Sequence, residues 1–272
     1  DGLEVLRRLA HRGATGADPK TGDGAGILIQ IPHEFFLKKA SECKINLPEI
    51  GEYGTGLIFL PNDKNERQFC RDTFSKIIRE HNMQLLGTRC VPVDYSLIGH
   101  FAKDTKPGIE QIFIGKNIPG RRPPAEEDVL DFERALYVIR KKVENSIRNS
   151  KLKEKKSFYI TNLSSRTFSY KGLLMPNQLE EFFPDLKDSG LKSALALVHS
   201  RYSTNTFPTW DLAQPFRYLA HNGEINTLRG NINWMHAREG LLKSKFFANS
   251  LKKIFPVIVP GGSDSATIDN VF

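Results

Sequence analysis

Residues 194–224 read ALALVHSRYSTNTFPTWDLAQPFRYLAHNGE and predict two short strands, each followed by a polar turn. The apolar run at residues 195–198 ends in His199, and the run at residues 216–220 ends in His221. Loops that leave a rigid strand are a common place for binding and catalytic side chains. Functional side chains are therefore expected in these two turns.

Apolar residues elsewhere predict further strands and amphipathic helices. A buried strand is predicted at residues 27–31, and Pro32 ends it. Shorter strands are predicted by the runs at residues 57–60, 111–114, 158–161 and 167–170. Apolar side chains recur at helical spacing within residues 3–10, 69–78 and 129–147. Because strands and helices do not alternate as in a doubly wound sheet, and no internal repeat is present, this order favours an α+β layered fold.

The composition is that of a folded protein without a membrane span. The chain has 272 residues, of which 39% are hydrophobic and 10% aromatic, and this is too apolar for a disordered chain. No apolar run approaches the roughly 18 residues that a membrane-spanning helix needs. Cys43, Cys70 and Cys90 form no CxxC pair, which argues against a disulfide framework and a cysteine zinc site. We therefore expect a cytoplasmic setting, no membrane partner and no metal in this segment.

The net charge is +8, and much of the excess lies in residues 140–156. A basic run of this kind can mark a nucleic-acid surface. Here it ends a predicted helix that is preceded by the acidic residues 126–128, and this arrangement suits the helix dipole without any partner. We therefore interpret the run as a solvated helix face and expect no nucleic acid to bind.

The glycine-rich segment at residues 22–26, GDGAG, resembles a nucleotide-binding loop only superficially. A dinucleotide site needs GxGxxG after a strand and before a helix, whereas this segment is GxGxG and precedes a strand. The chain also has no GxxxxGK[ST] motif. The segment therefore predicts close backbone packing beside the strand at residues 27–31.

Three polar clusters lie in the last third of the chain, at residues 199–204, 221–224 and 261–265. Each has a purely local interpretation. Arg201 can pair with an acid on the surface, Asn222 and Gly223 form a turn dipeptide, and Ser263 or Asp264 can cap a helix. Taken singly, these local roles are the simpler explanation.

Taken together, the clusters supply what a site for an amide substrate needs. Arg201 can hold a carboxylate through two hydrogen bonds, and Asp264 can hold an ammonium group. The side-chain amide of Asn222 and the backbone N–H of Gly223 can form a two-donor oxyanion hole.

No nucleophile accompanies these groups in the sequence. His199 and Ser200 are consecutive on a predicted strand, so their side chains face opposite ways. The chain has no GxSxG motif, and its three cysteines lie outside the polar clusters. Cys70 is predicted in an amphipathic helix, and Cys43 and Cys90 in connecting segments. The residues alone therefore predict binding and charge stabilisation without an attacking group.

Four motifs resemble those of the class II glutamine amidotransferases, which are N-terminal-nucleophile hydrolases. They are His11-Arg12-Gly13, the HSRYST string at residues 199–204, His221-Asn222-Gly223 and Ser263-Asp264-Ser265. Two longer strings, HRGATGADPKTGDGAGILIQIP and HSRYSTNTFPTWDLAQPFRYLAHNGEINTLRGNINWM, are similar to the amidotransferase domain of glutamate synthases. The resemblance covers essentially the whole chain and is weakest at residues 103–187.

The resemblance implies a four-layer αββα sandwich of two mainly antiparallel sheets. Residues 1–272 would then be one incomplete amidotransferase domain, cut at both ends. In this family the nucleophile is a cysteine at the mature N-terminus, upstream of the equivalent of Asp1. Its free α-amine, with a pKa near 8, can act as the base. The chain as written is therefore expected to release no ammonia.

The resemblance also implies a role for each matched residue. Arg201 would bind the α-carboxylate of L-glutamine, and Asp264 would bind its α-amino group. Asn222 and Gly223 would form the oxyanion hole. Arg12 would support the loop around the nucleophile, and Thr204 would be a further substrate contact.

The complete glutamate synthase would pass ammonia to a second site, where 2-oxoglutarate becomes L-glutamate. By resemblance, its synthase domains carry FMN and an iron–sulfur cluster, and its electrons come from a small NAD(P)H-dependent subunit or ferredoxin. None of those binding regions is expected in this segment. Two alternatives stay open, namely another class II amidotransferase and a glutamine-binding module without hydrolysis. Residues 206–210 and 224–235 favour glutamate synthase, because their likeness extends beyond the shared catalytic motifs.

Overall fold

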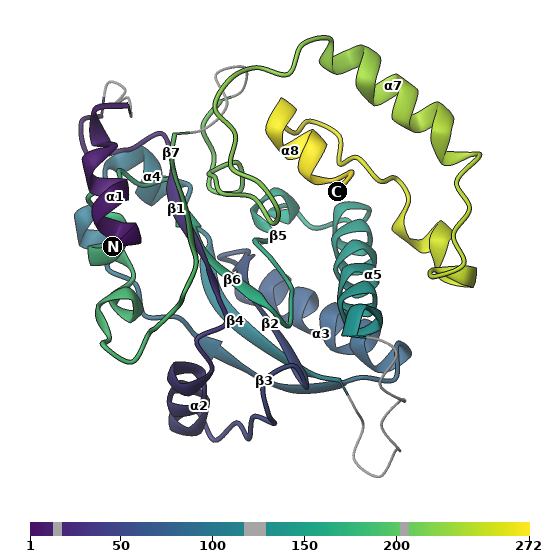
Figure 1. Cartoon of the computed structure of the whole chain (residues 1–272), viewed down its shortest axis with the longest axis horizontal. Helices are drawn as coiled ribbons and strands as arrows, with labels where there is room; N and C mark the ends of the chain where they lie inside the picture. The colour runs from purple at the N-terminus through teal and green to yellow at the C-terminus, as the bar shows by residue number, and fades with distance from the viewer. Residues whose placement is uncertain (13–17, 117–128, 202–206) are drawn as a thin grey trace.

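Two antiparallel β-sheets form the centre of the protein, and helices lie outside them (Figure 1). The computed structural model describes residues 1–12, 18–116, 129–201 and 207–272. The first sheet has the order β6–β1–β7, with β1 at Ala25–Gln30, β6 at Thr167–Gly172 and β7 at Ala196–Ser200. The second has the order β3–β4–β2–β5, with β2 at Tyr53–Leu60, β3 at Gln84–Cys90, β4 at Gly108–Gly115 and β5 at Tyr159–Ile160. All pairings within these sheets are antiparallel, which confirms the α+β prediction.

One apolar core lies between the two sheets. Alternate residues of the strands point into it, because successive side chains of a strand face opposite ways. Helix α2 (His33–Glu42) contributes Phe36, whose ring packs edge-on against Phe168 with centroids 5.0 Å apart. The strand residues in this core include Ile27, Ile29, Leu57, Phe59, Phe113, Phe168 and Tyr170.

A second core lies on the other face of the four-stranded sheet. Helices α3 (Lys64–Glu80) and α5 (Val129–Arg148) bury their apolar faces there, against Ile58, Leu60, Ile112 and Ile114. Helix α1 (Gly2–Arg8) lies against β7 at the opposite side of the molecule (Figure 1). The succession is therefore helix, sheet, sheet, helix, as the family resemblance implied.

The remaining helical segments are short, apart from α7 (Leu228–Glu239), which buries none of its residues. The short α-helices are α4 (His100–Asp104), α6 (Leu179–Phe182) and α8 (Asp264–Asp269). The 3-10 turns are η1 (Ala10–Arg12), η2 (Tyr95–Leu97), η3 (Lys155–Ser157), η4 (Pro184–Lys187) and η5 (Ala248–Ile254). Within the described part of the chain, none of the helices combines the length and the apolarity needed to cross a bilayer.

The prediction of a strand at residues 216–220 is wrong. The backbone N–H of Phe216 donates to the carbonyl of Leu219 at 2.9 Å, which closes a turn. The N–H groups of Arg217 and Tyr218 donate to one carboxylate oxygen of Asp269, at 2.8 and 3.2 Å. A buried carboxylate thus replaces the neighbouring strand as the hydrogen-bond partner of this backbone.

The expectation that Cys90 lies in a connecting segment is also wrong, because Cys90 is the last residue of β3. This strand reads QLLGTRC, with neither strict alternation nor a continuous apolar run, and it carries a register shift between Leu85 and Gly87. The bulge interrupts the pattern by which a strand is recognised.

The interpretation of residues 140–156 as a solvated helix face is wrong for Arg140 and Lys141, which are both buried. The Nζ of Lys141 donates to the carbonyl of Val257 at 2.8 Å, and burial lowers the pKa of this ammonium to about 7. The reason is that the C-terminal segment folds back over α5 and covers this part of the helix.

The glycine-rich segment packs its backbone closely, as predicted. A Cβ placed on Gly26 would lie 2.6 Å from the Cβ of Lys171 and 2.7 Å from the carbonyl oxygen of Gln214. Neither atom is the far end of a flexible side chain. Gly26 thus lets the segment that contains Gln214 approach β1.

We expect Gly26→Ala to lower the free energy of unfolding by about 1–3 kcal/mol, because the added methyl overpacks this contact. Chemical denaturation would measure the change. The matched control is Gly240→Ala, directly after the last residue of α7, where the backbone is in the right-handed helical region and a Cβ would meet nothing closer than 3.8 Å. The control should be neutral or stabilising by up to about 1 kcal/mol. Equal stabilities of the two variants would contradict the close approach at Gly26.

Candidate active site

The first two polar clusters meet through His199 and Asn222. His199 lies in β7, and its Nε2 is 2.7 Å from Oδ1 of Asn222. Its Nδ1 is 3.0 Å from the carbonyl oxygen of Arg201. When Nε2 carries the proton, the ring donates to Oδ1 of Asn222 and leaves the amide NH2 of that residue free to donate elsewhere.

Burial lowers the pKa of the His199 imidazole below its usual value, although contacts with Asn222 and Arg201 oppose this shift. Burial therefore favours the neutral form of the ring, which has one N–H to donate. His199 thus acts as a fixed hydrogen-bonding support for Asn222.

The second and third clusters meet through Asp264. This buried residue opens α8, and Ser263 caps the helix by accepting a hydrogen bond from the backbone N–H of Ala266. Oδ2 of Asp264 accepts a hydrogen bond of 2.8 Å from the backbone N–H of Ile225. Ser265 lies beside His221, with 3.4 Å between its Oγ and the ring Nδ1. The three clusters, separate in sequence, therefore form one region.

Arg201 follows β7 directly and has an unusual backbone conformation, with φ at 104°. Its N–H donates to the carbonyl of Gly24 at 2.7 Å, which fixes the chain at the end of β1. Its half-exposed guanidinium has Nε 3.7 Å from a carboxylate oxygen of the buried Asp23. Non-glycine residues held in such conformations often belong to functional sites. The glycine-rich segment thus serves the site by holding Arg201.

Asn222 and Gly223 are both exposed. Gly223 has φ at 129°, a conformation that side-chain-bearing residues rarely adopt. This geometry can offer an amide NH2 and a backbone N–H to a developing negative oxygen. Together with the guanidinium of Arg201 and the carboxylate of Asp264, the region holds groups of the kinds that recognise an amino acid.

Two predicted site residues cannot be placed. The backbone of Arg12 ends η1, but its side chain lies outside the described residues. Thr204 lies outside them altogether.

The three cysteines lie apart from these clusters. Cys70 is buried in α3, where burial raises the pKa of its thiol to about 12, so it is not a nucleophile at neutral pH. Cys43 follows α2 and Cys90 ends β3, and both are exposed. Among the described residues, no three His, Cys, Asp or Glu side chains gather as a metal site would require.

A cavity of about 830 Å³ lies beside the region, lined among others by Trp210, Arg217 and Gly261. None of the predicted site residues lines it. The predicted site residues therefore lie outside the lining of this cavity, and Asn222 and Gly223 are exposed to solvent.

Sequence reasoning missed the residues that hold the site together. Gln214 accepts a hydrogen bond of 2.9 Å from the backbone N–H of His221, and Asp269 accepts from the backbone of Arg217 and Tyr218. These partners come together only through the fold, and no local pattern signals them. His199 belongs to the first polar cluster predicted from the sequence, but its contact with Asn222 was not expected.

Comparison with known proteins gives one consistent result. Residues 1–272 match the family model of the class II glutamine amidotransferases. The chain is 50% identical over 272 residues to the glutamate synthase (NADPH) large chain of Bacillus subtilis (strain 168). It is 43% identical over 276 residues to the glutamate synthase (NADH) of Saccharomyces cerevisiae, and 39% identical over 270 residues to a chloroplastic ferredoxin-dependent glutamate synthase of Oryza sativa subsp. japonica.

These matches cover 99–100% of the chain but only 17%, 12% and 16% of the three relatives. The chain thus spans less than a fifth of the length of the glutamate synthases that it matches. The family model covers every residue of the chain, and so the chain belongs to the class II glutamine amidotransferases.

Proposed function

We propose that the chain is the glutamine-hydrolysing domain of a glutamate synthase. The observation that carries the proposal is the meeting of the three polar clusters, through His199 with Asn222 and through Ile225 with Asp264. The likeness to glutamate synthases over the whole chain supports the same function.

Charge complementarity orients the substrate in this proposal. The α-carboxylate of glutamine pairs with the guanidinium of Arg201, whose planar donors match a carboxylate. The α-ammonium group pairs with the carboxylate of Asp264. The side-chain amide of the substrate then reaches the donors of Asn222 and Gly223.

Those donors act when the amide is attacked. A thiolate adds to the amide carbon, and the carbonyl oxygen becomes an anion that accepts hydrogen bonds from Asn222 Nδ2 and Gly223 N–H. One such donor lowers the barrier by about 2.7–4 kcal/mol. Collapse of the tetrahedral intermediate breaks the C–N bond and releases ammonia, after protonation of the nitrogen. Water then cleaves the thioester, yielding glutamate and the free thiol.

We place the nucleophile outside these 272 residues, on a cysteine whose own α-amine is the base. The positions of Cys43, Cys70 and Cys90, away from the three clusters, support this assignment. Arg12 and Thr204 keep their proposed roles at the nucleophile loop and the substrate.

The rest of the reaction is assigned to the synthase domains of the same polypeptide. Ammonia passes to them and converts 2-oxoglutarate to L-glutamate, with FMN and an iron–sulfur cluster bound there. The described residues do not fit such a cluster, because the three cysteines lie on separate elements. The relatives are named for NADPH, NADH or ferredoxin, so the electron donor differs among them. A cytoplasmic location and the absence of a nucleic-acid partner belong to the same proposal.

We expect Asp264→Asn in the full-length protein to raise the KM for glutamine about tenfold or more. The substrate ammonium would lose its charged partner, and hydrogen bonds to charged groups contribute about 1.5–3 kcal/mol. Asparagine keeps the size of the side chain and one acceptor oxygen. Steady-state ammonia release at varied glutamine would measure the change. An unchanged KM would remove Asp264 from the substrate site.

We expect the 272-residue chain expressed alone to release no ammonia from glutamine, since its three cysteines are not placed to attack. The assay is ammonia release at saturating glutamine, with the full-length protein as the positive control. Activity of the short chain that is lost on thiol alkylation would refute the placement of the nucleophile. Glutamine binding without hydrolysis by the full-length protein would instead favour a binding module.

A further inference from the structure

We propose that Arg217 is a positioning residue for glutamine hydrolysis, because its buried guanidinium joins the loop that carries Asn222 and Gly223 to the helix that begins at Asp264. This inference rests on the proposed function. The guanidinium of Arg217 bonds to Asp269, Glu144 and Ile160 and not to a residue assigned to the substrate, so its role is positioning and not substrate binding.

The first link is the contact between Arg217 and Asp269 at the end of α8. Nη1 of Arg217 donates to Oδ2 of Asp269 at 2.7 Å. The other oxygen of Asp269, Oδ1, accepts the backbone N–H of Arg217 at 2.8 Å and that of Tyr218 at 3.2 Å. The carboxylate of Asp269 is fully buried. One carboxylate therefore fixes both the side chain and the backbone of the loop to α8.

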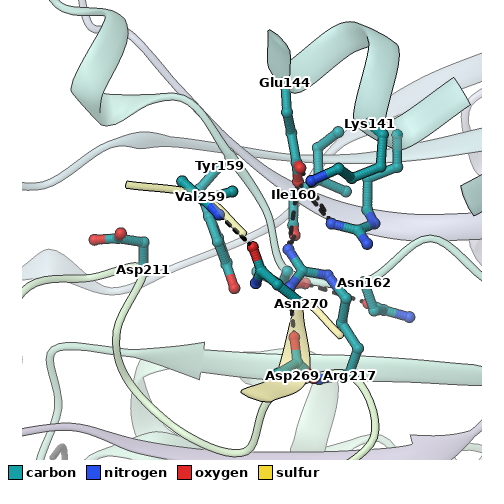
Figure 2. A network of polar contacts seen from close by, with 12 residues as sticks. Lys141, Glu144, Tyr159, Ile160, Asn162, Asp211, Arg217, Val259, Asp269 and Asn270 are labelled. Atoms are coloured by element: carbon teal, nitrogen blue, oxygen red, sulfur yellow. Dashed lines mark hydrogen bonds and ion pairs between the residues drawn. The ribbon is translucent and has the colours of Figure 1, made fainter. Parts of the chain in front are cut away.

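The second link ties this pair to the sheet and to α5. Nη2 of Arg217 donates to the carbonyl oxygen of Ile160 in β5 at 2.8 Å and lies 3.3 Å from Oε1 of Glu144. Glu144 in turn pairs with Arg140 at 3.1 Å. Figure 2 shows the guanidinium of Arg217 between Asp269 on one side and Glu144 and Ile160 on the other. The loop, α8, α5 and β5 thus meet at one side chain.

The third link connects the Arg217 network to the segment that carries Asn222 and Gly223. Gln214 accepts the backbone N–H of His221 at 2.9 Å, which closes the loop of residues 214–221 that contains Arg217 and leads to Asn222. On the preceding side, Nζ of Lys171 in β6 donates to the carbonyl oxygens of Asp211 and Ala213, at 2.8 and 2.7 Å. Asn222 and Gly223 therefore follow directly on a segment whose backbone is held by Gln214 and Lys171.

The charges of the network explain why it forms despite burial. Burial alone would lower the pKa of Arg217, but Tyr159, Asp269 and Glu144 together raise it, so the guanidinium stays charged. Burial would raise the pKa of Glu144, but Arg140 and Arg217 hold it below its usual value. Removing one member leaves an unpaired buried charge, which proteins tolerate poorly.

Lysine cannot replace Arg217 in this role. The planar guanidinium reaches Asp269 through one nitrogen and Ile160 and Glu144 through another, whereas an ammonium is a compact point charge on a flexible stem. With lysine, the charge would remain and the spacing between the loop and α8 would be lost. A displacement of about 1 Å in catalytic geometry can cost a hundredfold in rate.

The test compares Arg217→Lys with Arg89→Lys in the full-length protein. Arg89 is a matched control, since it is equally buried and its Nη2 lies 2.5 Å from Oδ1 of Asp185, away from the polar clusters. We expect Arg217→Lys to lower kcat for ammonia release about tenfold to a hundredfold, more than it changes KM. We expect Arg89→Lys to lower the Tm by a similar amount and to leave kcat unchanged. Asp269→Asn serves as a second variant and should also lower kcat.

Amide hydrogen exchange on the same proteins measures how firmly the loop and α8 are held, independently of activity. In Arg217→Lys, amide exchange should rise together in residues 214–225 and 263–270, while Arg89→Lys leaves both segments protected. Unchanged kcat and unchanged exchange in the folded Arg217 and Asp269 variants would overturn the inference, as would an equal loss of kcat in the Arg89 control. A wild-type protein that releases no ammonia would refute the proposed function instead, and the exchange data would still decide the positioning role.

Discussion

The packing of two antiparallel sheets face to face sets where the site can form. Ile27 and Ile29 of β1 fill the core between the sheets, and Leu28 is buried on the opposite face, so a shift of one residue in register would exchange the side chains that fill the two faces. This constraint fixes the pairing of β1 with β7, and hence the point where β7 ends. The end of β7 sets the positions of His199 and Arg201, and the backbone N–H of Arg201 donates to the carbonyl of Gly24, just before β1.

A small number of polar contacts between distant segments completes the site on this frame. Each contact is modest by itself, because a typical hydrogen bond contributes about 0.5–1.5 kcal/mol to stability. The contacts of His199 with Asn222, Ile225 with Asp264 and Arg217 with Asp269 act on the same two segments, the loop at residues 214–225 and α8. Their combined effect is to hold Asn222 and Asp264 relative to each other, and the proposed function assigns both residues to the substrate.

The sequence predicted the apolar frame better than the polar contacts. Strands such as β2 and β6 and the helix α5 follow from local apolar patterns, and those patterns reflect burial in the two cores. Residues 216–220 were predicted to form a strand because most of their side chains are apolar. Their backbone instead bonds to Asp269, which lies about fifty residues further along the chain. Partners at such separations leave no local signature, so neither this turn nor the burial of Lys141 could be predicted.

The candidate site shows the same division. Residue type and the family resemblance predicted the site residues Arg201, Asn222, Gly223 and Asp264, and the structure brings their clusters together. The supporting contacts of His199, Gln214 and Asp269 were not foreseen, because they depend on which loops meet.

Covalent labelling of the full-length protein with a diazoketone analogue of glutamine, followed by peptide mapping, tests the proposed site most directly. We expect one adduct, on a cysteine at the mature N-terminus upstream of Asp1, with loss of ammonia release and protection by added glutamine. An adduct on Cys43, Cys70 or Cys90 would contradict the proposal that Arg201, Asn222, Gly223 and Asp264 hold glutamine for attack by an N-terminal thiol. The absence of any adduct, in a protein whose intact N-terminus is confirmed, would contradict it as well.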